Sequence, residues 1–223
     1  MLDAENQDWL DKVQAMDLAV LEEEPYLSWT VQLRKDLDPK RYRHVLGVTR
    51  TAMFLARRYG QNEYQAISAA YLHDCAKKKE DVYFAKLKDL GVLQDKDYRP
   101  SPTYHAFLGG LVAQYFYGVK DPLVISAIQA HTQGAEQMSK LDKIVFLSDL
   151  IEPNRNFEGL AGLRELSLKG LTKGTLAAFD HTLTYLIETG KVIELLSVKA
   201  RNGLIFEMQA QEGFKTENNS MQS

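Results

Sequence analysis

Apolar residues along this chain recur with the three- and four-residue spacing of an α-helix in almost every segment that shows a regular pattern. The clearest example begins at Asp38, a suitable N-cap, is followed by Pro39 at the first helical position, and ends at Gly60. Its apolar face contains Val45, Val48, Ala52, Leu55 and Tyr59. The pattern predicts an all-α protein.

Further helices have recognisable ends. Asn62 is an N-cap candidate for a helix over residues 63–75, and the small residues within it would let another helix approach closely. Ser139 and Asp142 resemble a capping box that opens a helix over residues 141–151, which Pro153 ends. Helices are also predicted over residues 171–189 and 192–209, the second interrupted near residues 201–203.

The chain of 223 residues is long enough for one substantial core and contains no Pro/Gly/Ser-rich linker. We therefore predict a single helical domain over residues 26–210. A helical extension over residues 1–25 precedes it, and a polar tail over residues 211–223 is predicted to be disordered.

Composition and net charge limit the kinds of molecule that the protein is expected to bind. A net charge of −3 gives no basic field for long nucleic acid, and the longest apolar stretches fall far short of a membrane span of ~20 residues. The single cysteine, Cys75, excludes an intramolecular disulfide, and no signal peptide is recognisable. We expect a cytoplasmic protein without a nucleic-acid or membrane partner.

Six residues in or beside helical stretches are candidate metal ligands, and four of the five histidines belong to this set. A divalent metal held by imidazoles and carboxylates with open positions lowers the pKa of bound water and polarises a phosphoryl oxygen. An aspartate beside a histidine at a helix end can ligate one metal and bridge to a second. The candidate ligands are His44, His73, Asp74, His105, His131 and Asp149.

A lone histidine near an apolar helical face is more often a hydrogen-bonded core residue than a ligand, so the joint occurrence carries the argument. His181 has no matching partners and is interpreted as structural. Asp142 and Glu152 are interpreted as a capping acid and a surface acid, respectively.

Six short motifs along the chain, taken in order, resemble those of a known protein family. Residues 41–45 (Arg-Tyr-Arg-His-Val), 72–77 (Leu-His-Asp-Cys-Ala-Lys) and 105–109 (His-Ala-Phe-Leu-Gly) are followed by 131–134 (His-Thr-Gln-Gly), 148–155 and 200–202. In this order, from about Pro39 to Gly203, they resemble the HD-domain phosphohydrolases, and more narrowly the bacterial YqeK-type symmetrical diadenosine tetraphosphatases. Gln133 replaces a threonine of that family's pattern, and Ser148 an alanine.

The resemblance implies a metal-dependent hydrolase that cleaves diadenosine tetraphosphate at its central anhydride bond into two ADP. His44, His73, Asp74 and Asp149 would hold a first, tighter metal, whereas His105 and His131 either complete a weaker second site or contact phosphate. Iron is the expected metal, with manganese or cobalt as substitutes. The implied partners are a dinucleoside polyphosphate, its ADP product and a second copy of the chain as a homodimer.

The resemblance also implies roles for charged and polar residues. Asp74 would orient the attacking water, and Lys77, Arg41 and Arg155 would neutralise charge on the phosphates. The remaining substrate contacts would be made by His105, His131, Thr132, Arg201 and Asn202.

Three alternatives stay open at this point. The nearest is another nucleotide phosphohydrolase of the same family, either a nucleotidase or a phosphodiesterase. A di-iron oxygenase uses a similar ligand set for a different reaction and predicts oxygen consumption. A nucleotide-binding module without turnover is the third, and the intact ligand set argues against it.

Overall fold

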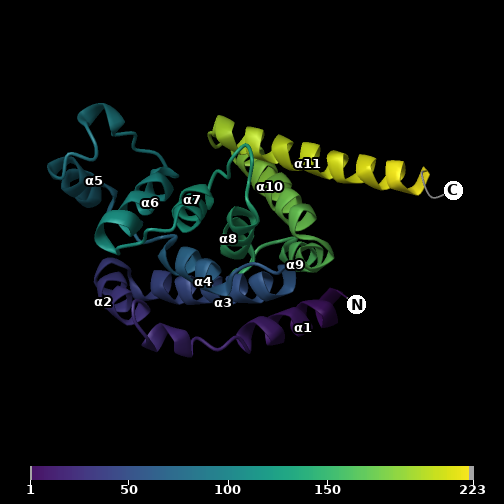
Figure 1. Cartoon of the computed structure of the whole chain (residues 1–223), viewed down its shortest axis with the longest axis horizontal. Helices are drawn as coiled ribbons and strands as arrows, with labels where there is room; N and C mark the ends of the chain where they lie inside the picture. The colour runs from purple at the N-terminus through teal and green to yellow at the C-terminus, as the bar shows by residue number, and fades with distance from the viewer. Residues whose placement is uncertain (1, 221–223) are drawn as a thin grey trace.

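A computed structural model describes residues 2–220 of the chain, and this part consists of helices joined by turns and loops (Figure 1). No strand occurs within residues 2–220, which confirms the prediction of an all-α fold. Two short 3₁₀ segments, Ala19–Glu22 and Asp95–Asp97, lie between longer helices. The α-helices are α1 (Leu2–Gln14), α2 (Tyr26–Asp36), α3 (Pro39–Tyr59), α4 (Glu63–Leu72), α5 (Glu80–Asp89), α6 (Tyr104–Phe116), α7 (Pro122–Ala130), α8 (Lys140–Ile151), α9 (Leu160–Lys169), α10 (Leu171–Glu188) and α11 (Leu195–Ser220).

The helix ends confirm the capping predictions. Asp38 accepts a hydrogen bond from the backbone N–H of Arg41 at the start of α3, and Gly60 ends that helix in the left-handed conformation at φ 62°. Ser139 and Asp142 form both bonds of the capping box that opens α8. Helix α4 is shorter than predicted, because it ends at Leu72 and leaves His73 as its C-cap.

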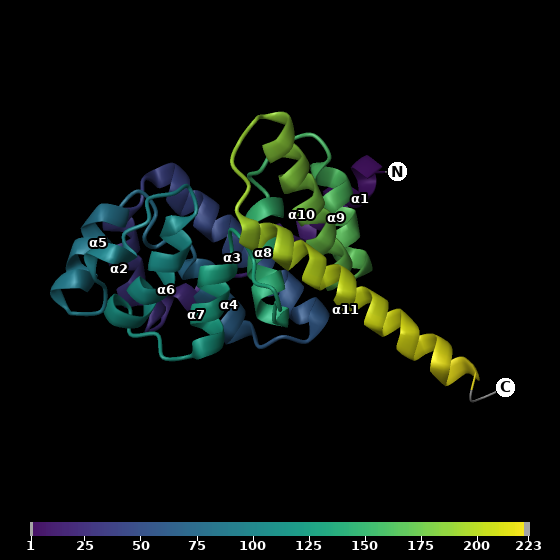
Figure 2. The ribbon, with the colours of Figure 1, turned by 90° about the horizontal axis from the view of Figure 1, so that it is seen from above.

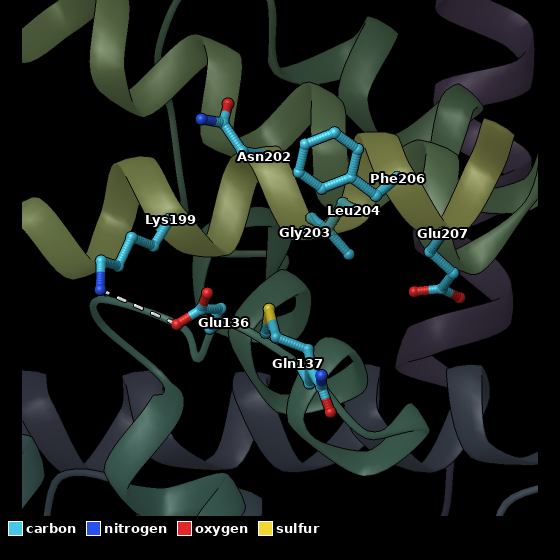
Figure 3. A pocket seen from close by; sticks show the side chains of 9 residues that line it. Glu136, Gln137, Lys199, Asn202, Gly203, Leu204, Phe206 and Glu207 are labelled. Atoms are coloured by element: carbon cyan, nitrogen blue, oxygen red, sulfur yellow. Dashed lines mark ion pairs between the residues drawn. The ribbon is translucent and has the colours of Figure 1, made fainter. Parts of the chain in front are cut away.

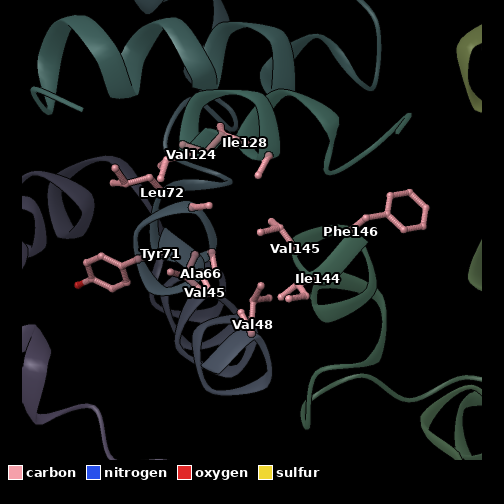
Figure 4. Close-up of a cluster of buried hydrophobic side chains, with 14 of the residues drawn as sticks. Val45, Val48, Ala66, Tyr71, Leu72, Val124, Ile128, Ile144, Val145 and Phe146 are labelled. Carbon is pink, nitrogen blue, oxygen red and sulfur yellow. The ribbon is translucent and has the colours of Figure 1, made fainter. Parts of the chain in front are cut away.

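One apolar core joins α3, α4, α7 and α8, the helices that carry or flank most of the candidate ligands (Figure 4). Ala66, Ala69 and Ala70 of α4 are fully buried, so this helix packs closely between its neighbours. The apolar side chains that α3, α7 and α8 contribute here include Val45, Val48, Val124, Ile128, Ile144 and Val145. Because these helices share a close-packed core, their ends are held at fixed positions relative to one another.

The first and last helices lie at the periphery. Helix α1 packs against α9 and α3, and α11 packs against α10 and then extends beyond the body of the protein (Figure 2). The predicted break near residues 201–203 is wrong, because α11 runs through Gly203 without interruption. A Cβ on Gly203 would lie 2.1 Å from the carbonyl oxygen of Glu136, so this glycine allows a close approach between α11 and a neighbouring segment.

The tail was predicted to be disordered from residue 211, whereas α11 continues as a helix to Ser220. Extending a helix that has already formed costs less than starting one, so a polar sequence without its own apolar face can prolong it. Residues 221–223 lie outside the described part. Among residues 2–220, no helix combines the length and apolar character needed to cross a membrane.

Candidate metal centre

The six candidate ligands meet in one cluster at the ends and inner faces of five helices or the segments directly after them. His44 lies in the second turn of α3 and His105 in the first turn of α6, whereas Asp149 lies in the last turns of α8. His73 and His131 are the C-caps of α4 and α7. The structure therefore brings together every residue that the sequence proposed as a metal ligand.

Two groups of donor atoms have separations suited to metal binding. The first group is His44, His73 and Asp149, and the second is His73, Asp74 and His131; within each group, all donor atoms lie within 4.8 Å of one another. Nε2 of His44 lies 3.0 Å from Oδ1 of Asp149. The buried Nε2 of His44 forms no hydrogen bond of good geometry within the described part of the chain, and its closeness to this carboxylate suits two ligands directed at a shared ion.

Asp74 belongs to the second group, and its two carboxylate oxygens face different histidines. Its Oδ2 is 3.4 Å from Nε2 of His73 and 4.0 Å from Nε2 of His44. Its Oδ1 is 3.4 Å from Nε2 of His105 and 3.7 Å from Nε2 of His131. The position of Asp74 therefore suits a carboxylate that bridges two ions.

His73 and His131 are oriented by the same local arrangement. Nδ1 of His73 lies 2.7 Å from the carbonyl oxygen of Ala70, and Nδ1 of His131 lies 2.6 Å from that of Ile128. In each case Nδ1–H donates to a carbonyl at a helix end, which leaves Nε2 unprotonated and directed into the cluster. Within the described part of the chain, the buried Nε2 of His73 has no hydrogen-bond partner, as expected for an atom that binds an ion.

His44 is oriented by a carboxylate instead. Its Nδ1 lies 3.1 Å from Oε1 of Glu152, which is buried with 1% of its surface exposed. The interpretation of Glu152 as a surface acid is therefore wrong. A Cβ on Gly47 would lie 2.2 Å from Oε2 of Glu152, so the glycine one turn after His44 makes room for this carboxylate. Gly47 beside His44 was therefore a sequence signal for a buried partner of that histidine, and the prediction missed it.

The electrostatic environment differs among the histidines. Burial lowers the pKa of His44, but the carboxylates of Asp149 and Glu152 outweigh burial and raise that pKa to about 9. Burial lowers the pKa of His105 to about 3 and that of His131 to about 4, and neighbouring imidazoles add to the effect. Burial alone would raise the pKa values of Asp74 and Asp149. Neighbouring histidines, joined by Arg155 in the case of Asp149, hold both pKa values well below their usual range.

Cationic side chains surround the cluster. Arg41 donates to Oδ2 of Asp74 at 2.9 Å, and Arg155 donates to Oδ1 of Asp149 at 2.6 Å. Nζ of Lys77 lies 3.1 Å from Nδ1 of His105. A cavity of about 440 Å³ opens beside His44, and its lining includes Lys40, Arg41, Arg43, Lys78 and Arg155. This cavity is suited to a polyanion.

A second cavity, of about 590 Å³, lies near the opposite end of the cluster. Thr103 and Gln133 line it, and they lie within two residues of His105 and His131 in sequence. Tyr104 and Phe107 form a stacked aromatic pair with ring centroids 5.9 Å apart, and Phe107 is 42% exposed. The hydroxyl oxygen of Thr132 is buried and has no protein partner among the described residues.

Arg201 and Asn202 make no hydrogen bond or ion pair with the candidate ligands in the described part of the chain. Arg201 donates to Oδ1 of Asp180 at 2.8 Å, and Asn202 lines a separate cavity of about 510 Å³ between α11 and residues 136–138 (Figure 3). The buried residues of this part of α11 are Ala200 and Leu204, so the side chains between them face away from the core. His181 stacks on Phe157, in line with its structural interpretation.

Comparison with known proteins gives a consistent result. The HD domain family matches residues 41–154. The chain is 32% identical over 178 residues to the symmetrical bis(5'-nucleosyl)-tetraphosphatase of Halalkalibacterium halodurans, which covers 79% of this chain and 95% of that protein. It is 31% identical to the protein of the same name from Bacillus subtilis, over 72% of this chain and 87% of the relative.

A solved structure agrees with these relationships. A crystal structure from Clostridium acetobutylicum, described as a predicted HD superfamily hydrolase involved in NAD metabolism, matches with a TM-score of 0.72 and 33% identity. The match covers 82% of this chain and 97% of the other.

Proposed function

The chain belongs to the HD-domain family, and we infer that it is a metal-dependent hydrolase that cleaves diadenosine tetraphosphate symmetrically into two ADP. The relatives that match most of its length are symmetrical bis(5'-nucleosyl)-tetraphosphatases. The structural observation that best supports this inference is the bridging position of Asp74 between two groups of donor atoms beside a cationic cavity.

The ligand set fits a divalent metal, since buried imidazole nitrogens and carboxylate oxygens converge, and Nε2 of His44 and of His73 have no hydrogen-bond partner among the described residues. We propose iron, with manganese or cobalt as substitutes, because mixed imidazole and carboxylate ligands suit these ions. When bound, such an ion supplies a water of lowered pKa and polarises a phosphoryl oxygen. In this proposal His44, His73, Asp74 and Asp149 hold the first ion, and His105 and His131 contribute to a second ion or contact phosphate.

The other residues of the site bind and orient the substrate. Arg41, Lys77 and Arg155 carry positive charge at the cluster and are positioned to neutralise phosphate oxygens. Asp74 is placed to orient the attacking water, because its oxygens face both donor groups. The hydroxyl group of Thr132, which has no partner among the described residues, is our candidate for a contact with a phosphate oxygen.

The second cavity offers an aromatic surface for one nucleoside of the substrate. Phe107 is half-exposed there and stacks on Tyr104, and stacking on an aromatic ring suits any purine. Because Arg201 pairs with Asp180 outside both cavities near the cluster, we assign a substrate contact neither to it nor to Asn202.

The test is hydrolysis of diadenosine tetraphosphate in oxygen-18 water by protein reconstituted with Fe²⁺ or Mn²⁺, with the products read by mass spectrometry. Symmetric attack gives ADP as the sole nucleotide product, with one labelled oxygen per pair. AMP and ATP in equal amounts would mean asymmetric attack, and no turnover with any of these metals would remove the assignment.

A further inference from the structure

Arg164, in α9, is a buried cation that connects the metal centre to the N-terminal helix. Only 3% of its surface is exposed. Its guanidinium donates from Nε to the carbonyl oxygen of Ile151 at 3.0 Å and from Nη2 to that of Glu152 at 2.9 Å. Its third donor, Nη1, bonds to Oδ1 of Asn6 at 3.0 Å. One planar group thus ties the C-terminal end of α8 to α1.

Helix α1 covers this guanidinium with an aromatic face. The Arg164 Cζ atom lies 4.6 Å from the centroid of the Trp9 ring, and Trp9 is fully buried. An aromatic face attracts a cation most strongly where water is excluded, so Trp9 offsets part of the cost of burying Arg164. Trp9 also contacts α3, because its ring meets that of Phe54 edge to face with centroids 6.3 Å apart.

The connection continues from Arg164 to a proposed metal ligand through a single residue. Arg164 holds the backbone carbonyl of Glu152, and the side chain of Glu152 bonds to Nδ1 of His44. Oε2 of the same carboxylate accepts from Asn154 N–H at 2.7 Å, so both ends of Glu152 are fixed. A shift of the backbone at Glu152 would therefore move the group that orients His44.

We propose that α1 is a positioning element for the metal centre, in which Trp9 and Asn6 fix Arg164, Arg164 fixes Glu152, and Glu152 fixes His44. This proposal rests on the proposed function, because it treats His44 as a metal ligand. Loss of a partner that orients a ligating histidine costs about 10–100-fold in metal affinity. Trp9 touches none of the proposed ligands, and in this proposal it acts through Arg164.

A helix that only stabilises the fold would give a different result, and α1 supplies a matched control. Val13 is also fully buried on α1 but makes none of the contacts with Arg164. Trp9→Phe is the conservative variant, because the Trp9 indole N–H has no partner among the described residues and the aromatic face is retained. Trp9→Leu keeps an apolar group there without an aromatic face.

The experiment measures Mn²⁺ affinity and melting temperature for the full chain and for Trp9→Ala, Trp9→Leu, Trp9→Phe and Val13→Ala. We expect Trp9→Ala and Trp9→Leu to bind Mn²⁺ about 10–100-fold more weakly, with Trp9→Phe close to the parent. Val13→Ala should lower the melting temperature and leave Mn²⁺ affinity unchanged. If Trp9→Ala does not fold, Trp9→Leu decides the outcome.

The proposal is overturned if Trp9→Leu retains the parent affinity, or if Val13→Ala loses as much affinity as the Trp9 variants at a similar melting temperature. Failure of the proposed function would look different, because the parent protein itself would then bind no Mn²⁺ or would not hydrolyse the dinucleotide.

Discussion

Histidines lie at both ends of the ligand cluster, but their surroundings shift the histidine pKa values in opposite directions. At one end, which we call the carboxylate end, His44 lies between Asp149 and Glu152 and its pKa is raised to about 9. At the other, the imidazole end, the pKa values of His105 and His131 are lowered to about 3 and about 4. Near neutral pH the metal-free protein therefore carries an imidazolium at one end and two neutral imidazoles at the other.

This difference shows that the two ends are prepared for metal in different ways. Binding of an ion at the carboxylate end must displace a proton from His44, whereas the imidazole end has donors that are already deprotonated. Asp74 faces both ends and is the residue through which they are joined. The following predictions separate the ends or test the link between them.

The largest effect is expected from Asp74→Ala, which removes the link. The variant should lose bound metal and at least several kcal/mol of transition-state stabilisation, on the order of a 10³-fold fall in turnover. Metal content by mass spectrometry and turnover of diadenosine tetraphosphate are the measurements. Asp180→Ala removes a carboxylate outside the cluster and serves as the control. Full turnover by a metal-free Asp74→Ala protein would contradict the metal mechanism.

Lys77→Ala tests the imidazole end, where Lys77 is the cation in contact with His105. We expect the variant to keep its metal and to lose about 2–4 kcal/mol in kcat/KM, because the charge acts on phosphate rather than on the ion. Steady-state kinetics and metal analysis check both parts. Lys88→Ala removes a surface lysine paired with Asp95 and should behave as the parent. Loss of metal together with unchanged substrate affinity would exclude this role.

Arg155 was expected to act in the same way as Lys77, but its contacts give it a second effect. It donates to both the carboxylate and the backbone carbonyl of Asp149. Arg155→Ala is therefore a poor test of phosphate binding alone, since it also releases a proposed ligand.

Glu152→Gln tests the carboxylate end without replacing a proposed ligand. Glutamine has nearly the same shape, but it removes the negative charge that favours the bond to His44. Metal affinity should fall by about 10–100-fold, as for other partners that orient a ligating histidine. Glu165→Gln, at a glutamate paired with Lys169 on the outside of α9, is the control. Equal affinities in the two variants would show that Glu152 does not orient His44.

The smallest effect concerns the pH dependence of stability in the metal-free protein. The pKa of His44 is raised from 6.5 to about 9 on folding, so its contribution is complete below pH 6.5 and is lost as the pH rises through about 9. The lowered pKa values of His105 and His131 give contributions that are present above pH 6.5 and are lost as the pH falls. The melting temperature should therefore be highest near pH 6.5.

Thermal melts between about pH 4 and 10 in the presence of a chelator measure this profile. His44→Gln should flatten the alkaline decline and leave the acid decline in place. A parent profile that keeps rising up to pH 9 would contradict the raised pKa of His44.

The sequence was informative where local chemistry decides the structure. Asp38 starts a helix because its side chain accepts a hydrogen bond from Arg41 N–H, and Pro39 suits the first helical position. The six candidate ligands could be recognised because each lies on or beside a predicted helix. Glu152 was misread because its burial depends on Gly47, which is distant in sequence and belongs to another helix. The break predicted at Gly203 was wrong for the same reason. This glycine allows close packing against Glu136 and does not form a turn.

Two of the imidazoles in this centre depend on partners that substitution cannot readily delete. His73 and His131 are oriented by backbone carbonyls of Ala70 and Ile128, and every residue type supplies such a carbonyl. Evolutionary drift at positions 70 and 128 is therefore limited by packing alone. His44 depends on the side chain of Glu152, so a single codon change can remove its orientation. Inactive descendants of this protein should accordingly arise at position 152 more readily than at position 70 or 128.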